Sequence, residues 1–145
     1  MNLSEHFTFE ELTASETAAR LGIGNEPSES AFENLKRLAD ALETVRMVLR
    51  KPILITSGYR SKELNRMVGG SKNSAHMFGM AADFICPQFG TPLEVCRAVA
   101  KHGIDFDQII HEYGRWCHFA IGDAGIAARK ELLTATRNGY EKGLA

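Results

Sequence analysis

The feature that most constrains this chain is an aspartate inside an apolar run, MAADFIC, at residues 80–86. The run is short and is followed by Pro87, which predicts a buried strand. A carboxylate in a buried strand is unfavourable unless an opposite charge or a metal ion compensates for its lost hydration. The fold must therefore bring such partners to Asp83.

Two of the five histidines occupy positions that could serve this purpose. His76 lies in a glycine-containing loop just before the strand of Asp83, and His118 lies within the apolar run WCHFAI at 116–121. A single histidine in a strand is typical of a hydrogen-bonded core residue, and the spacing HxxxxxxD is a loose pattern. Two imidazoles and one carboxylate, however, are the protein ligands of many zinc hydrolases. The residues leave both interpretations open.

Hydrophobic periodicity and capping signals predict an α+β fold with a mostly antiparallel sheet and helices packed on it. SAFE at 30–33 is a capping box that opens a long amphipathic helix, and Gly114-Arg115 is the expected two-residue turn of a hairpin. The capping box TFEE at 8–11 predicts a short first helix, and three further helices are expected at 31–49, 61–70 and 91–103. The expected strands cover 53–58, 80–86, 107–113, 116–121 and 131–136.

Length and charge limit the other possibilities. A chain of 145 residues predicts one domain over 1–145, with residues 1–30 as an N-terminal helical extension. The net charge of −1 favours neither nucleic acid nor an anionic membrane as a partner, and no apolar run is long enough for a membrane span. We expect a monomer, made in the cytoplasm without a signal peptide because no basic segment precedes an apolar one at the N-terminus.

The three cysteines are widely spaced and predict small buried hydrophobic residues rather than disulfides. Cys117 is the alternative candidate, either as a thiolate ligand or as a nucleophile, because it adjoins His118. Alternation along the strand places it on the opposite face from His118.

Residues 57–84, SGYRSKELNRMVGGSKNSAHMFGMAADF, resemble the zinc D-alanyl-D-alanine carboxypeptidase and L-alanyl-D-glutamate endopeptidase family. These enzymes cut bacterial cell-wall peptides, and many phage lysins are members. The family pattern has an SGYRS-like strand end, then SxHxxGxAxD, then WxH, and all three pieces occur here in order. The resemblance covers residues 50 to 121 and implies a fold like that of hedgehog and the D-Ala-D-Ala metallopeptidases.

The resemblance also implies roles for individual residues. The zinc ligands would be His76, Asp83 and His118. Arg60 would bind or polarise the substrate, and Ser74 would contact the peptide. The small residues Gly79 and Ala81 would let the backbone pass the metal.

One position departs from the family pattern. Several members have an acidic general base three residues before the last histidine, where this chain has Arg115. The nearest carboxylate is Glu112, which we predict to be the base. A two-residue turn would pair Glu112 with Cys117, so a longer turn or a bulge is needed to bring it to the face of His118.

Taken together, the sequence predicts zinc-dependent hydrolysis of peptide bonds in peptidoglycan stem peptides, by a carboxypeptidase or an endopeptidase. Peptidoglycan peptides are the expected partners, and the cell wall is the expected place of action after release from a phage or prophage host. The main alternative is a non-catalytic zinc-containing binding module of the same fold, as in the hedgehog signalling domain. A thiol enzyme that uses Cys117 is a weaker third possibility, since no base or orienting partner is evident.

Overall fold

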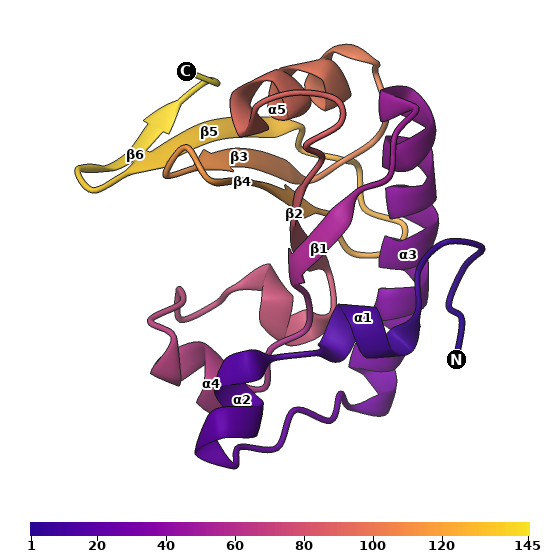
Figure 1. The fold of residues 1–145 in the computed structure, drawn as a ribbon, viewed down its shortest axis with the longest axis vertical. Coiled ribbons are helices and arrows are strands. Elements are labelled where there is room, and N and C mark those ends of the chain that lie inside the picture. Colours follow the sequence, from indigo (N-terminus) through magenta and orange to yellow (C-terminus); the bar gives the residue numbers. More distant parts are fainter.

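A six-stranded sheet with the strand order β1-β2-β4-β3-β5-β6 forms the centre of the computed structural model, which describes residues 1–145 (Figure 1). Neighbouring strands are antiparallel except for the parallel pair β3 and β5. The strands are β1 (Leu54–Ser57), β2 (Ala81–Ile85), β3 (Gln108–Glu112), β4 (Trp116–Ala120), β5 (Glu131–Thr136) and β6 (Gly139–Lys142). The helices are α1 (Phe9–Thr13), α2 (Glu16–Leu21), α3 (Glu29–Leu49), α4 (Lys62–Met67), the 3₁₀ helix η1 (Ala75–Phe78) and α5 (Pro92–Lys101).

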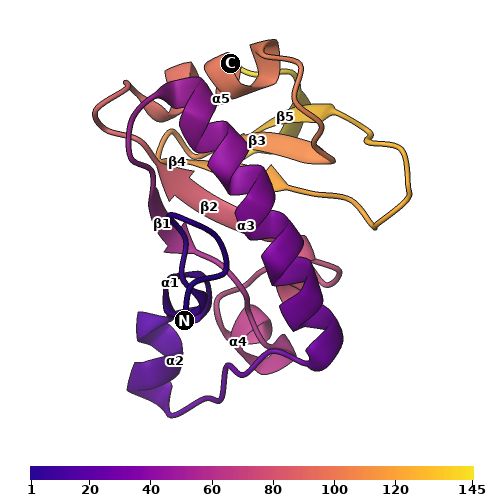
Figure 2. The ribbon, with the colours of Figure 1, turned by 90° about the vertical axis from the view of Figure 1, so that its right-hand side faces the viewer.

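Helices α3 and α5 cover one face of the sheet (Figure 2). The apolar stripe of α3 is fully buried, and it packs in one core with Phe84 of β2 and Phe119 of β4. Helix α3 begins at Glu29, slightly before the predicted start, because Ser28 rather than Ser30 accepts the capping hydrogen bond from the Ala31 amide. The other face of the sheet is left for polar side chains, and Asp83 and His118 lie on it by alternation.

The first thirty residues pack against the segment that follows β1. Phe7 and Leu12 belong to the hydrophobic core, and the Leu12 carbonyl accepts a hydrogen bond of 2.8 Å from the Tyr59 amide. A Cβ at Gly58 would overlap the Leu12 carbonyl oxygen, so only glycine permits this close approach. The N-terminal segment is thus in direct contact with residues near the predicted site.

Residues after β4 return along the sheet and add two strands. Strand β5 lies parallel beside β3, and β6 forms the sheet edge next to it, in yellow in Figure 1. The residues that follow β6 are fixed to β5, since Thr134 Oγ1 donates to the Gly143 carbonyl at 2.7 Å and accepts from the Ala145 amide at 2.9 Å.

The predicted fold class is confirmed, and the differences are local. Helix α2 and strand β6 were not predicted, and the hairpin between β3 and β4 has three turn residues, Tyr113–Arg115, rather than two. The cysteines are free and buried as predicted. No helix combines the length and hydropathy that a membrane span requires.

Candidate metal centre

Three side chains from separate parts of the chain converge on the open face of the sheet. The Asp83 carboxylate oxygen Oδ1 lies 2.9 Å from His118 Nδ1 and 3.3 Å from His76 Nε2. One ligand atom from each of the three residues lies within 4.8 Å of the others, and all three residues are buried. The residues that the sequence predicts as metal ligands are therefore brought together by the fold.

The loop before β2 fixes His76. Ser74 Oγ caps η1 by accepting the His76 amide at 3.2 Å, and His76 Nδ1 lies 2.8 Å from the Gly58 carbonyl oxygen. A carbonyl only accepts, so Nδ1 carries the proton and Nε2 keeps its lone pair. That lone pair faces the Asp83 carboxylate, and two acceptors at this separation require a cation between them. A proton or a metal ion meets this requirement, and a histidine held through its second nitrogen is typical of metal sites.

Strand β2 holds Asp83 between β1 and β4, opposite Ser57 and His118. Burial alone would raise the pKa of this carboxyl, but the positive charge that His76 carries when a proton occupies the gap at Nε2, together with the hydrogen bond with His118, outweighs it. The pKa of Asp83 therefore lies well below its usual range. The residues around Asp83 thus keep this buried carboxylate as an anion.

Arg60 completes the surroundings of Asp83. Its side chain is only 17% exposed, and Nη2 lies 3.5 Å from Asp83 Oδ2. Nε donates to Ser57 Oγ and Nη1 donates to Asn65 Oδ1, both at 3.3 Å. Arg60 is therefore not a free surface arginine, and its guanidinium is held in place beside the candidate metal site.

The hairpin register places Glu112 on the face of His118. Glu112 pairs with Trp116, and Ile110 pairs with His118, because three residues form the turn. Tyr113 and Gly114 both have left-handed backbone, with φ of 58° and 69°. The two-residue turn expected from the sequence is wrong. With one more residue in the turn, Glu112 pairs with Trp116 instead of Cys117 and so shares a face of the sheet with His118. The longer turn that Glu112 needs is present.

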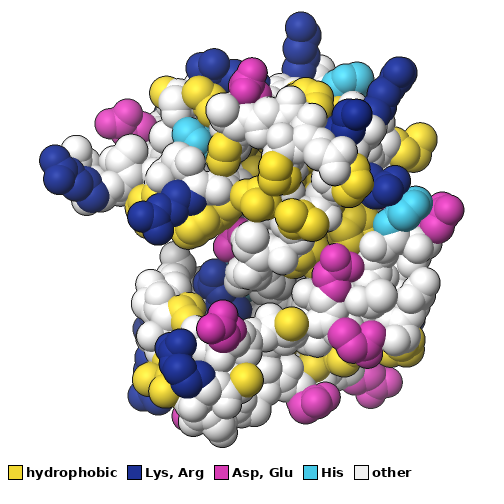
Figure 3. All heavy atoms as spheres, in the orientation of Figure 1, with side chains coloured by type: hydrophobic (Ala, Val, Ile, Leu, Met, Phe, Trp, Pro, Cys, Tyr) yellow, Lys and Arg dark blue, Asp and Glu magenta, His cyan; other side chains and the backbone are white.

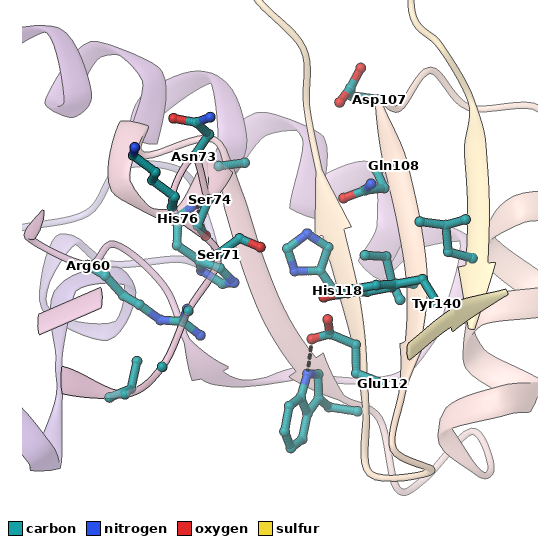
Figure 4. A pocket seen from close by; sticks show the side chains of 18 of the residues that line it. Arg60, Ser71, Asn73, Ser74, His76, Asp107, Gln108, Glu112, His118 and Tyr140 are labelled. Atoms are coloured by element: carbon teal, nitrogen blue, oxygen red, sulfur yellow. Dashed lines mark hydrogen bonds between the residues drawn. The ribbon is translucent and has the colours of Figure 1, made fainter. Parts of the chain in front are cut away.

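An open groove of about 940 Å³ joins these residues. Figure 3 shows the surface hollowed between the part that carries α4 and the part that carries the β5–β6 hairpin. In Figure 4, Arg60, Ser74 and His76 come from one side of the groove, and Glu112, His118 and Tyr140 come from the other.

The carboxylate of Glu112 is oriented by a tryptophan. Trp116 Nε1 donates to Glu112 Oε1 at 2.6 Å, drawn as a dashed line in Figure 4. Asp107 is the other carboxylate that lines the groove, but both its oxygens accept from Arg129, at 2.7 and 2.8 Å. Glu112 is therefore the groove carboxylate with an oxygen free of a cationic partner.

Gly79 and Cys117 both lie away from the candidate metal site. Gly79 does not face the metal site, since a Cβ there would overlap the Ala31 carbonyl of α3, and its φ of 72° ends η1. The expectation that it lets the backbone pass the metal is thus wrong. Cys117 lies in the core, and burial together with Cys96 raises the pKa of its thiol well above the ordinary value. This leaves no reactive thiolate for a thiol enzyme.

A protein-family model described as Peptidase M15 matches residues 5–120. The chain belongs to the peptidase M15 family. The M15 match begins much earlier than the resemblance seen in the motifs, and it includes α1, α2 and α3. It ends with β4, so β5 and β6 lie outside it.

A curated relative agrees with the M15 assignment. Over 53 residues the chain is 54% identical to the zinc D-Ala-D-Ala carboxypeptidase of Streptomyces albus G. That stretch is 37% of this chain and 20% of the relative, so the chain spans a minor part of the relative's length. Zn²⁺ is the cofactor that the family and the donor set indicate, because two imidazoles and one carboxylate with an open position fit zinc.

Sequence reasoning missed Asn65, which holds Arg60, and Tyr140, which lines the groove. Asn65 is buried beside Arg60 and donates to the Ser71 carbonyl at 2.8 Å, but an asparagine within a short helix has no distinctive sequence signal. Tyr140 lies on β6, which was not predicted because its four residues are all exposed and show no alternation.

Proposed function

We propose that this chain is a zinc metallopeptidase, formed by a single domain over residues 1–145. The observation that carries the proposal is the convergence of His76, Asp83 and His118. The two histidines line a groove that is also lined by Glu112 and Arg60. Structural zinc sites are usually closed by four protein ligands. Three ligands beside an open groove are instead typical of catalytic zinc.

The proposed chemistry divides between the metal and the side chains. A bound zinc ion supplies Lewis acidity and lowers the pKa of a water ligand to about 7. Glu112 acts as the general base and takes up a proton at Oε2, since Oε1 is held by Trp116. The same carboxyl group then returns that proton to the leaving amine.

Arg60 binds the substrate in this proposal. A guanidinium presents a planar fork of donors that suits a carboxylate or a developing oxyanion. The contacts of Arg60 with Ser57 and Asn65 fix the plane of that fork before the substrate arrives. Ser74 is the proposed second contact to the peptide, since its hydroxyl accepts from His76 and still has a proton to donate.

The proposed substrates are stem peptides of bacterial peptidoglycan. The name of the Streptomyces relative, which states D-Ala-D-Ala as its target, supports this substrate class. The proposal includes cleavage at D-Ala-D-Ala by a carboxypeptidase and cleavage within the stem by an endopeptidase. The proposed place of action is the bacterial cell wall.

The alternative of a non-catalytic zinc module depends on Glu112 being out of reach. The three-residue turn puts Glu112 in the groove on the face of His118. This position supports the enzyme over the binding module.

Metal analysis together with digestion of purified peptidoglycan tests the proposal. We expect about one zinc per chain and soluble products identified by mass spectrometry: free D-alanine from a carboxypeptidase, or cut stem peptides from an endopeptidase. His118→Ala is the control, because it removes a ligand and should abolish both zinc and products. A protein that binds zinc and releases nothing from peptidoglycan or from D-Ala-D-Ala peptides is the binding module instead.

A further inference from the structure

Tyr140 is an aromatic residue that the fold does not use for packing. All four residues of β6 are exposed, and Tyr140 itself is 57% exposed. Single exposed aromatics are common on protein surfaces. This one, however, lines the groove that holds the candidate metal site. In Figure 4 its side chain points from the terminal strand into that groove.

Strand pairing places Tyr140 in line with the candidate base. Trp116 pairs with Glu112, Glu112 pairs with Ala135, and Ala135 pairs with Tyr140. These four residues form one row across β4, β3, β5 and β6, on the same face of the sheet. Two strand spacings, about 9.5 Å, separate Glu112 from Tyr140. The intervening Ala135 has only a methyl group, so a tyrosine side chain can lean over it towards Glu112.

Acidic groups in the groove affect the pKa of the Tyr140 hydroxyl. Partial burial raises the pKa of Tyr140, and the charges of Glu112 and Asp83 add to the effect. The hydroxyl therefore stays protonated and is a hydrogen-bond donor at neutral pH.

The terminal hairpin is held firmly enough to position this donor. The Gly143 amide donates to the Leu132 carbonyl at 2.8 Å, and Thr134 bonds to residues 143 and 145. His111 Nδ1 lies 2.9 Å from the Ala145 carbonyl oxygen on the opposite face of the sheet. These contacts fix the chain directly after β6 and limit the movement of Tyr140.

We propose that Tyr140 is a substrate-binding residue whose hydroxyl donates a hydrogen bond to a carbonyl or carboxylate oxygen of the bound peptide. The inference rests on the proposed peptidase function. Arg60 lies on the opposite side of the groove, so the two residues contact the peptide from both sides. Tyr140 lies beyond residue 120, where the family match ends, so this contact belongs to the added β5–β6 hairpin.

Steady-state kinetics on the zinc-loaded protein test this role, with diacetyl-L-Lys-D-Ala-D-Ala and isolated stem peptides as substrates. Tyr140→Phe removes the hydroxyl and keeps the ring, and should lower kcat/KM by about 3- to 30-fold, the range for one hydrogen bond. Glu141→Ala is the matched control, because Glu141 pairs with Thr134 and faces away from the groove. It should match the wild type, and zinc content and Tm should be unchanged in both variants.

The fluorescence of Trp116, the only tryptophan of the chain, gives a readout that does not need turnover. Peptide titrations that follow this signal should show a Kd raised by about the same factor in Tyr140→Phe. A phenylalanine variant within twofold of the wild type in both assays overturns the proposal. So does normal behaviour of Tyr140→Phe alongside a weakened Tyr140→Ala, which would assign the contact to the ring. A wild type that neither binds nor cleaves these peptides refutes the proposed function itself.

Discussion

Replacing Glu112 by glutamine separates its proposed role as a base from its structural contacts. Glutamine keeps an oxygen at the position of Oε1, so it can still accept the 2.6 Å hydrogen bond from Trp116. It loses the second carboxylate oxygen, which is the proposed proton acceptor. The fold, the groove and the zinc content should therefore be preserved, and the free energy of unfolding should change by less than about 0.5 kcal/mol, as for other partly exposed positions.

The expected effect lies in turnover. General base catalysis typically contributes about 10²- to 10⁴-fold, so kcat should fall by that factor while KM changes little. At about 1.36 kcal/mol for each factor of ten, the barrier should rise by about 2.7 to 5.4 kcal/mol. The assay is release of D-alanine from diacetyl-L-Lys-D-Ala-D-Ala, or of cut stem peptides from peptidoglycan, with zinc measured on the same sample.

Asp107→Asn is the matched control, because Asp107 also lines the groove but is paired with Arg129. Loss of this exposed ion pair should lower stability by only about 0.2–1 kcal/mol and leave most of the activity. Wild-type turnover in Glu112→Gln, or a large loss in Asp107→Asn alone, would show that the base has been assigned to the wrong residue.

Three further changes test other parts of the site. Alanine at His76, Asp83 or His118 should reduce the zinc content from about one per chain to a small fraction; a triple variant that retains zinc by mass spectrometry would rule out this ligand set. Arg60→Lys should lower kcat/KM by about 10- to 100-fold with normal zinc, because a point charge does not replace a bidentate fork; unchanged kinetics would mean that the guanidinium does not touch the substrate. Gly58→Ala should lower the free energy of unfolding by about 1–3 kcal/mol in urea, since its Cβ would overlap the Leu12 carbonyl. Gly24→Ala, which has open space, is the control, and equal stability of the two variants would contradict the close packing at Gly58.

The convergence at Asp83 was predictable from the sequence because burial of a carboxylate is a strong constraint. An apolar strand that contains an aspartate requires a compensating partner, and few other residues of this chain could serve. Helix α5 was predictable because its capping box and its apolar stripe agree, and the long helix α3 was predictable from its apolar stripe, although its cap is Ser28 rather than Ser30.

The facing of Glu112 could not be predicted in the same way. It depends on whether the turn has two or three residues, and Tyr113 adopts a left-handed backbone that tyrosine rarely takes. Strand β6 and Tyr140 were missed because edge strands with two exposed faces lack an apolar pattern. The parallel pairing of β5 with β3 depends on how the intervening residues cross the sheet, which local sequence does not encode.

Gly58 contacts both the proposed metal ligand His76 and the N-terminal segment. Its carbonyl holds the proposed metal ligand His76, while its missing side chain admits the Leu12 carbonyl of the N-terminal segment. Thermodynamic linkage is reciprocal, so any preference of the metal for the docked arrangement must be matched by an equal effect of docking on metal affinity. If the metal has such a preference, residues 1–30 contribute to its affinity without supplying a ligand, and a chain shortened at its N-terminus should bind zinc less tightly at a site some fifty residues further along the sequence.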